Sequence, residues 1–492
     1  MPFTLAISAA TAQAGAALTR AAIGTDPGTM PLPGPPVLAW QSADQRAAIL
    51  HWGTPGDTIW ADEAIWADEA SATLHARTSI TRIDPVYLAE QPGAVILSDR
   101  AGWAAAVTGR RTAPDPVLIA AMINLGYPLG AHTPYRGVRA LAGGQSITVT
   151  SGRLTSCSHP PGQPAASSPG SAASVAAALV DAVAPLADSP APVEVSLTGG
   201  KDSRLIAAAL TAAKVPFRAR THGAPDHPDV LIAAAIADRL GIEHIVTAPR
   251  PPATVTADDV LARLRTSVLV TDGMLSAFEN TGSPGPRPDH IHAGGHGGEL
   301  LRGGYATYAR NPARGAVQFR RLTTRRLGLL RPGASTAYLG ALAPWTARFA
   351  RAPLATLDDF YLVNRAGRWS AAARQAYLLR ERLVQPFFGD AVVRAARAVP
   401  LRTRIDGSLH RNLLTALCPG LLDIPLAGRA PARADWRRSY GEDIAAFLRG
   451  YILDSGGPLF EVIRRPAADR ALRIPHADPE LAWLLATLTA SR

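Results

Sequence analysis

The chain is poor in two reactive residue types, cysteine and lysine. Its 492 residues contain two cysteines, Cys157 and Cys418, and two lysines, Lys201 and Lys214. So few cysteines, without a His/Cys cluster at metal-ligand spacing, argue against structural zinc and for a reducing, cytoplasmic location. No apolar run reaches the roughly 18 residues of a membrane-spanning helix, and Met1 to Leu18 lacks the early basic cluster of a signal peptide. We therefore expect a cytoplasmic protein without a membrane span.

Because lysine is scarce, 48 of the 50 basic residues are arginine, and the net charge is +11. The arginines are scattered or form short pairs such as Arg320-Arg321, with no basic stretch interleaved with aromatic residues. A nucleic-acid-binding module usually concentrates its basic residues, so we expect no nucleic-acid partner. A cationic surface suits a phosphate-rich substrate and an acidic peptide instead.

Length and composition predict more than one domain. A chain of 492 residues exceeds the usual size of one core, and 47% hydrophobic residues can fill two or three cores. The most linker-like stretch is rich in Pro, Ser and Gly and runs from Ser158 to Ser171. We expect an N-terminal domain over residues 1–157, a linker over 158–171 and a second domain over 172–492, which starts with a helix from Ala172 to Ala187.

The segment Ser196-Leu197-Thr198-Gly199-Gly200-Lys201-Asp202-Ser203-Arg204 predicts a phosphate-binding turn. It joins a strand-like run, Val193 to Leu197, to a helix-like run, Leu205 to Ala213. Its two glycines let the backbone pass close to a polyphosphate, and the start of the helix offers free N–H groups to an anion. No G-x-x-x-x-G-K-[ST] sequence occurs, so the turn is not a Walker loop.

A second glycine-rich segment, Gly295-His296-Gly297-Gly298-Glu299-Leu300-Leu301-Arg302-Gly303-Gly304-Tyr305, follows the apolar stretch Asp289 to Ala293. The segment places an acidic residue, Glu299, on a different loop from Asp202. At the ends of parallel strands, two such carboxylates can hold one Mg²⁺ against ATP phosphates. We therefore expect Asp202 and Glu299 to be the metal ligands.

A third segment, Thr221 to Asp229, lies between the two loops. It follows a strand-like run, Phe217 to Arg220, and precedes a helical run, Val230 to Leu240, and then a strand, Gly241 to Val246. Such alternation predicts a parallel sheet. Asp226, more than Asp229, is expected to cap the helix.

These segments carry a family resemblance. The first resembles the S-G-G-x-D-S loop of ATP pyrophosphatases, with Thr198 at the first serine position, and the second resembles the G-x-G-x-D-x-x-x-G-G-Y segment of asparagine synthetases. Val117 to Gly130 and Thr133 to Gly144 resemble the end of the asparagine synthetase glutaminase domain, with Ala94 to Asp99 as one of its strands. The resemblance thus covers nearly the whole chain.

The resemblance implies an α/β fold in two parts. The N-terminal part would be an Ntn-hydrolase-like, inactive glutaminase-like α/β sandwich, and the C-terminal part a parallel-sheet ATP-pyrophosphatase (adenine nucleotide α-hydrolase-like) domain. It also implies ATP and Mg²⁺ as cofactors and an AMP-forming amide ligase. The residues that it assigns to ATP and pyrophosphate are Ser196, Thr198, Gly199, Gly200, Lys201, Asp202, Ser203, His222, Gly223, Gly295, Gly297 and Gly298.

Glutaminase domains of this family use an N-terminal cysteine, exposed after methionine removal, to release ammonia from glutamine. Here residue 2 is Pro2, and neither cysteine lies at the start of the sequence. We therefore expect no glutamine-dependent ammonia production, so that the substrate itself supplies the amine.

Two groups of the family use an amine of the substrate: the β-lactam and carbapenam synthetases, and the lasso peptide macrolactam synthetases. The run from Thr198 to Arg204, with Arg204 where the small-molecule enzymes more often have a small residue, is more similar to the lasso group, as is Gly297 to Gly303. That similarity implies a precursor peptide as substrate and possible contacts with a leader peptidase and a leader-recognition protein. A degenerate scaffold that only binds a peptide or nucleotide stays an alternative.

Three further residues are candidates for catalysis, each with a plainer alternative. His296 replaces a tyrosine that serves as part of the general base in the lactam-forming small-molecule enzymes, or it is merely an exposed loop histidine. Arg429 replaces a late family lysine that stabilises the acyl-adenylate intermediate, or it is a surface arginine.

Arg365 lies in a region, Asp359 to Arg438, that is predicted to be mainly helical, with Tyr377 to Arg382 in one helix. Arg365 and Arg368 are three residues apart and should share a helix face. They would form a cationic wall for a substrate carboxylate, or they would pin helices to the sheet.

Overall fold

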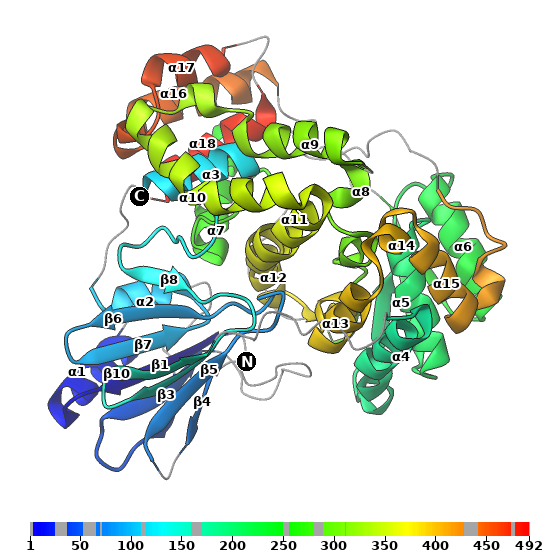
Figure 1. Cartoon of the computed structure of the whole chain (residues 1–492), viewed down its shortest axis with the longest axis horizontal. Helices are drawn as coiled ribbons and strands as arrows, with labels where there is room; N and C mark the ends of the chain where they lie inside the picture. The colour runs from blue at the N-terminus through cyan, green and yellow to red at the C-terminus, as the bar shows by residue number, and fades with distance from the viewer. Residues whose placement is uncertain are drawn as a thin grey trace.

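The structure of the chain is a computed structural model. It describes residues 3–24, 37–52, 65–68, 71–109, 115–158, 170–248, 255–279, 289–309, 311–427, 441–473 and 478–491. Antiparallel sheets dominate the first third of the chain, and a parallel sheet with many helices follows (Figure 1). The mixed α/β class expected from the sequence is confirmed.

The first third contains two antiparallel sheets. The larger has the order β2-β3-β1-β7-β6-β8, and the smaller β10-β9-β5-β4. The strand expected over 94–99 is observed as β7, and all five of its residues are buried because it lies inside the larger sheet. The strands are β1 (Phe3–Ala9), β2 (Val37–Gln41), β3 (Ala47–Trp52), β4 (Ile65–Asp68), β5 (Thr73–Arg77), β6 (Tyr87–Gln91), β7 (Ala94–Ser98), β8 (Val138–Ala140), β9 (Ser146–Thr150) and β10 (Arg153–Ser158).

The two sheets share one apolar core. Leu88 and Leu97 of the larger sheet pack with Leu74 and Val149 of the smaller one. The other face of the larger sheet packs against α1 (Ala12–Ile23) and α2 (Ala101–Val107), where Trp103 is fully buried. The layers therefore follow the order helices, sheet, sheet, and the Ntn-hydrolase-like nature of this part stays a prediction.

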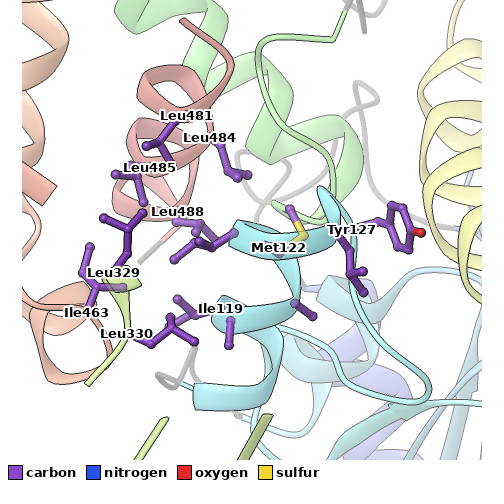
Figure 2. Packing of buried hydrophobic residues seen from close by; sticks show 14 of the residues in the cluster. Ile119, Met122, Tyr127, Leu329, Leu330, Ile463, Leu481, Leu484, Leu485 and Leu488 are labelled. Carbon is purple, nitrogen blue, oxygen red and sulfur yellow. The ribbon is translucent and has the colours of Figure 1, made fainter. Parts of the chain in front are cut away.

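Helix α3 (Pro116–Leu125) leaves the antiparallel sheets and enters a different core. Its N-cap is Asp115, and eight of its ten residues are buried, which suits an interior helix. Ile119 and Met122 pack with Leu485 of α18 (Pro479–Ala490) and with Leu330 (Figure 2). Sequence-distant segments thus meet in one helical core.

The second part is built around a fully parallel sheet with the order β13-β12-β11-β14-β15. The expected alternation of strand and helix is confirmed, but the helical expectation for Tyr377 to Arg382 was wrong in part, because Arg382 begins the fifth strand. The elements are α4 (Ala172–Val183), β11 (Val193–Ser196), α5 (Lys201–Ala212), β12 (Phe217–His222), α6 (Pro228–Leu240), β13 (His244–Thr247), α7 (Ala257–Thr271), β14 (Ile291–Ala293) and β15 (Arg382–Val384).

The remaining α-helices and a π-helix follow β14 in the chain, and several of them contribute buried residues to the helical core. They are α8 (Ala306–Ala309), α9 (Pro312–Thr324), α10 (Pro332–Arg351), α11 (Pro353–Phe360), the π-helix η5 (Tyr361–Ser370), α12 (Ala371–Leu378), α13 (Asp390–Ala398), α14 (Leu401–Ile405), α15 (Ser408–Leu417), α16 (Glu442–Ser455) and α17 (Arg465–Ala471). A π-helix of ten residues is uncommon, and such segments often mark functional sites. Of the helices in the described ranges, none has the length and apolarity to cross a membrane.

Candidate active site

The two glycine-rich loops meet at the centre of the parallel sheet. They follow β11 and β14, which are neighbours although they are not consecutive in the chain. The strand order reverses there, and ligands of such sheets bind outside the carboxyl ends of the strands at this point. A Cβ atom on Gly295 would lie 2.7 Å from Ser203 N, and one on Gly298 would lie 2.2 Å from the Asp202 Cγ. Glycine is therefore required at both positions for the loops to touch.

The first loop is closed by its own hydroxyl groups. Ser203 Oγ accepts from Thr198 N at 3.2 Å, and Thr198 Oγ1 accepts from Gly200 N at 3.2 Å. Helix α5 begins right after the loop with Gly200 as its N-cap and no side-chain cap. The first N–H groups of the helix can therefore serve an anion. Lys201 is exposed at this helix start.

The loop is tied to α6 by Asp229, whose Oδ1 accepts from Gly199 N at 3.0 Å. The expectation that Asp226 caps α6 was wrong, because the N-cap is His227, whose Nδ1 accepts from Asp229 N. A ring nitrogen here takes the place of the carboxylate expected from Asp226. His222 ends β12 and Gly223 follows it, so both lie at the same edge of the sheet as the two loops.

Arg302 joins the two carboxylates that were expected to hold metal. Its Nη2 lies 2.7 Å from Asp202 Oδ2 and 3.6 Å from Glu299 Oε1. Both carboxylates are thus within reach of one cation, and two carboxylates with phosphate oxygens are a donor set that suits Mg²⁺. The donor chemistry fits the ion, and a bound ion would compete with the Arg302 guanidinium for the same oxygens.

His410 of α15 is the second partner of Asp202. Its side chain is 4% exposed, and its Nε2 lies 3.1 Å from Asp202 Oδ1. Sequence reasoning missed both Arg302 and His410. Arg302 stood inside a recognised motif, where its separation of three residues from Glu299 on a helical turn was a usable signal. His410 is distant in the chain and carried no such signal.

His296 is enclosed by aromatic rings. Its ring centroid lies 5.6 Å from that of Trp369 and 5.5 Å from that of Phe388, and its Nε2 is 2.9 Å from Ser370 Oγ. Burial lowers the pKa of His296 below 6.5 against the raising effect of Glu299. The imidazole is therefore neutral at neutral pH and is not the exposed loop histidine of the plainer alternative.

Arg365 lies beside this histidine, on the π-helix. Its Cζ is 3.5 Å from the Trp369 ring centroid and 5.8 Å from that of Tyr127. Its positive charge also lowers the pKa of His296, which places the two side chains in the same electrostatic neighbourhood. A guanidinium that stacks on an aromatic ring keeps its N–H donors free at its own edge, where they can bind a carboxylate.

The expectation that Arg365 and Arg368 share a face was wrong. The hydrogen bonds of a π-helix run from i to i+5, so its wider turn sends residues three apart to different sides. Arg368 is 3% exposed and donates to the His132 carbonyl. Arg368 therefore pins the helix in place, whereas Arg365 faces the aromatic groups around His296.

Tyr361 contacts both Glu299 and Tyr305, one of the tyrosines near Arg365. Its hydroxyl bonds to Glu299, and its pKa is raised, chiefly by burial and then by the Glu299 charge. The ring also meets Tyr305 edge-on at 5.1 Å, and the Tyr305 hydroxyl lies 2.7 Å from that of Tyr127. The raised pKa keeps the Tyr361 hydroxyl protonated, so it is the donor to Glu299.

Arg204 has a structural role that the sequence did not indicate. It is 2% exposed and donates to the carbonyls of Leu421 at 3.0 Å, Ile424 at 2.6 Å and Pro425 at 2.8 Å. These bonds hold the segment after α15 next to the phosphate loop, and Ala427 N donates to Gly199 O at 3.0 Å. Arg429 itself lies outside the described residues.

A family comparison agrees with this geometry. The asparagine synthase family profile matches residues 174–417. The match spans both glycine-rich loops, the π-helix and His410, and it ends at the last residue of α15. A comparison of the chain with curated proteins finds no match.

Proposed function

We propose that the chain closes a macrolactam ring in a peptide. The match of residues 174–417 to the asparagine synthase family, whose members are ATP-dependent ligases, supports ATP-dependent amide bond formation. The substrate is a leaderless precursor peptide with an internal Asp or Glu. ATP converts that side-chain carboxylate to an acyl-adenylate and pyrophosphate. The peptide's own α-amine then attacks the acyl carbon, AMP leaves, and an isopeptide bond remains.

The observation that carries the ATP part is the meeting of two acidic, glycine-rich loops at the reversal of strand order. Gly199, Gly200 and the start of α5 suit the phosphates, and Asp202 and Glu299 supply oxygen ligands for Mg²⁺. When bound, Mg²⁺ would neutralise charge on the phosphates. Arg302 contacts both carboxylates, His410 contacts Asp202, and the Tyr361 hydroxyl donates to Glu299, so these side chains hold the two carboxylates within reach of one cation.

The observation that supports a substrate-supplied amine is the chemistry around His296. An α-ammonium has an unperturbed pKa near 8, so a base need only remove one proton from a weak acid. His296 is neutral at neutral pH because burial lowers its pKa, and Ser370 orients the ring. Arg365 can hold a substrate carboxylate beside it, and intramolecular attack gains effective molarity once the peptide is bound in the right conformation.

Glutamine independence, a precursor peptide, and contacts with a leader peptidase or a leader-recognition protein belong to the same proposal. Arg429 as the charge that stabilises the acyl-adenylate is also part of it. Arg204 favours this assignment by holding the segment that leads to Arg429 against the phosphate loop.

Mass spectrometry of candidate peptides tests the proposal. A product about 18 Da lighter, equal to one water, should form only with ATP and Mg²⁺, together with equal amounts of AMP and pyrophosphate. Changing the acceptor Asp or Glu to Ala in the peptide should prevent closure. Closure of a small β-amino acid instead would favour a β-lactam synthetase-like reaction, and nucleotide binding without turnover of any acceptor would favour a scaffold.

A further inference from the structure

A turn of the antiparallel part, Ser79 to Arg82, bonds to both of the segments that surround His296. One is the π-helix, which carries Trp369 and Ser370, and the other contains Phe388. Thr81 Oγ1 donates to the Phe388 carbonyl at 3.3 Å. Next to it, Ile80 N donates to Asp390 Oδ1 at 2.8 Å.

Arg82 makes the contact with the π-helix. Its Nε donates to the Gly367 carbonyl at 3.1 Å and its Nη2 to the Val363 carbonyl at 3.3 Å, while Nη1 bonds Leu141 O at 2.8 Å. A Cβ on Gly367 would lie 3.0 Å from Thr81 O, so the turn is packed directly on the helix backbone. One guanidinium therefore connects two carbonyls of the π-helix to the antiparallel part.

Arg82 has an unfavourable backbone conformation, and its charged side chain is buried. Its φ is +53°, in the left-handed region that residues other than glycine rarely adopt. The side chain is 3% exposed, and burial, with the nearby Arg368, lowers the pKa of its guanidinium to about 9. Such strain persists only where the surroundings impose it, and it gathers at functional sites.

A second segment of the N-terminal third, residues 130–132, also forms hydrogen bonds with the π-helix. Gly130 N donates to Asn364 Oδ1 at 3.1 Å, and the His132 carbonyl accepts from Arg368. Tyr127, just before this segment, supplies a ring beneath Arg365. Residues 363, 364, 367 and 368 of the π-helix are thus all bonded to residues from the N-terminal third.

We propose that Arg82 is a positioning residue that fixes the π-helix, and through it Arg365, Trp369 and Ser370, around His296. The antiparallel part then contributes to the reaction by positioning the side chains around His296. The proposal rests on the proposed function only in assigning these side chains to the acceptor side. Its geometric content can be tested without an acceptor.

The test compares Arg82→Gly with the unchanged full-length chain by amide hydrogen exchange and by binding of α,β-methylene-ATP with Mg²⁺. Glycine suits the left-handed φ, so this variant removes the guanidinium without adding backbone strain. We expect exchange in residues 361–370 to become at least about tenfold faster, with the nucleotide Kd changed by less than about twofold. Arg82→Lys, which keeps a donor for the carbonyls, should restore part of the protection.

Arg100→Met is the matched control. Arg100 is 1% exposed, lies in the same part of the chain and bonds Leu269 O and Asp272 of the α7 region instead. This variant should loosen α7 and leave residues 361–370 as protected as before. Unchanged exchange at 361–370 in Arg82→Gly, or equal loosening of the whole molecule, would overturn the proposal.

If Arg82→Gly does not fold, the Thr81→Val variant tests whether the turn positions the π-helix. It removes the hydroxyl bond to Phe388 and keeps the shape of the side chain, so we expect faster exchange at residues 386–388 and 361–370. Protection equal to that of the unchanged chain in both segments would refute a positioning role for the turn. Failure of the proposed function has a separate signature, because it shows as absence of AMP formation by the unchanged chain.

Discussion

The proposed nucleotide side and the proposed acceptor side of the site are assembled in different ways. The nucleotide side uses loops that directly follow two neighbouring strands, and two of its glycines are required because an added Cβ would lie 2.7 Å from Ser203 N at Gly295 and 2.2 Å from Asp202 Cγ at Gly298. The acceptor side combines His296 with a π-helix, a separate aromatic residue and two segments of the N-terminal third. Local sequence therefore determines the first side, whereas packing between distant segments determines the second.

The largest effect is expected from Asp202→Asn on the nucleotide side. Asparagine keeps the shape and one acceptor oxygen, but it lacks the charge that a Mg²⁺ ligand needs, so AMP formation should fall on the order of a thousandfold. ATP–pyrophosphate exchange measures the loss, and a thermal melt checks the fold. The matched control is Asp226→Asn at an exposed position near the same edge, which should retain full turnover. Full turnover of Asp202→Asn would end its assignment as a ligand.

His296→Ala should give the next largest effect, and on the acceptor side alone. Loss of a general base costs about a hundredfold in ring closure, while adenylate formation should change much less. Because burial lowers the pKa of His296 below 6.5, closure by the unchanged chain should stay constant down to about pH 6.5 and fall only in more acidic solution. Single-turnover assays of the two steps across pH separate these effects. Equal slowing of both steps would make His296 a structural residue.

The lowered pKa of His296 also makes the stability of the folded state depend on pH. The folded chain disfavours protonated His296, so this residue makes the folded state less stable as the pH falls below 6.5, the unfolded pKa. An His296→Ala variant should lose that part of the pH dependence in a denaturant titration.

A smaller effect is expected from Arg365→Met. Removal of the guanidinium should raise the KM for the acceptor about tenfold, equivalent to ~1.4 kcal/mol, with little change in the melting temperature. Arg368→Met is the contrast, because Arg368 is buried and bonds His132, so its loss should lower the melting temperature. Identical behaviour of the two variants would show that the π-helix does not separate their roles.

The smallest effect concerns Arg302→Met. In the proposed site Arg302 would compete with Mg²⁺ for Asp202 and Glu299, and ion pairs as exposed as these contribute about 0.2–1 kcal/mol. The Mg²⁺ concentration for half-maximal binding of α,β-methylene-ATP should therefore fall by a factor of about 1.4 to 5. A higher Mg²⁺ requirement would contradict the competition and indicate that Arg302 helps to bind the phosphates.

The accuracy of the sequence predictions follows the same division. Glycine spacing and the alternation of strand and helix predicted the parallel sheet, because each signal lies within a few residues of the element that it describes. The fifth strand was missed because Arg382 to Val384 is three residues long and follows a helix without a turn signal. Arg368 was misjudged because three-residue spacing was interpreted with α-helical geometry, whereas the backbone there is π-helical. His410 and Arg82 reach the site only through tertiary packing, which no local pattern encodes.

The helix α3 sets a limit on how this chain can be shortened. A chain that started at Ala172 would keep both glycine-rich loops and lose Ile119 and Met122 from the helical core (Figure 2). Leu485 and Trp483 would then face water, and the molecule would expose a large apolar surface that favours aggregation. The N-terminal part is therefore needed for the packing of the helical core, whether or not it carries any chemistry of its own.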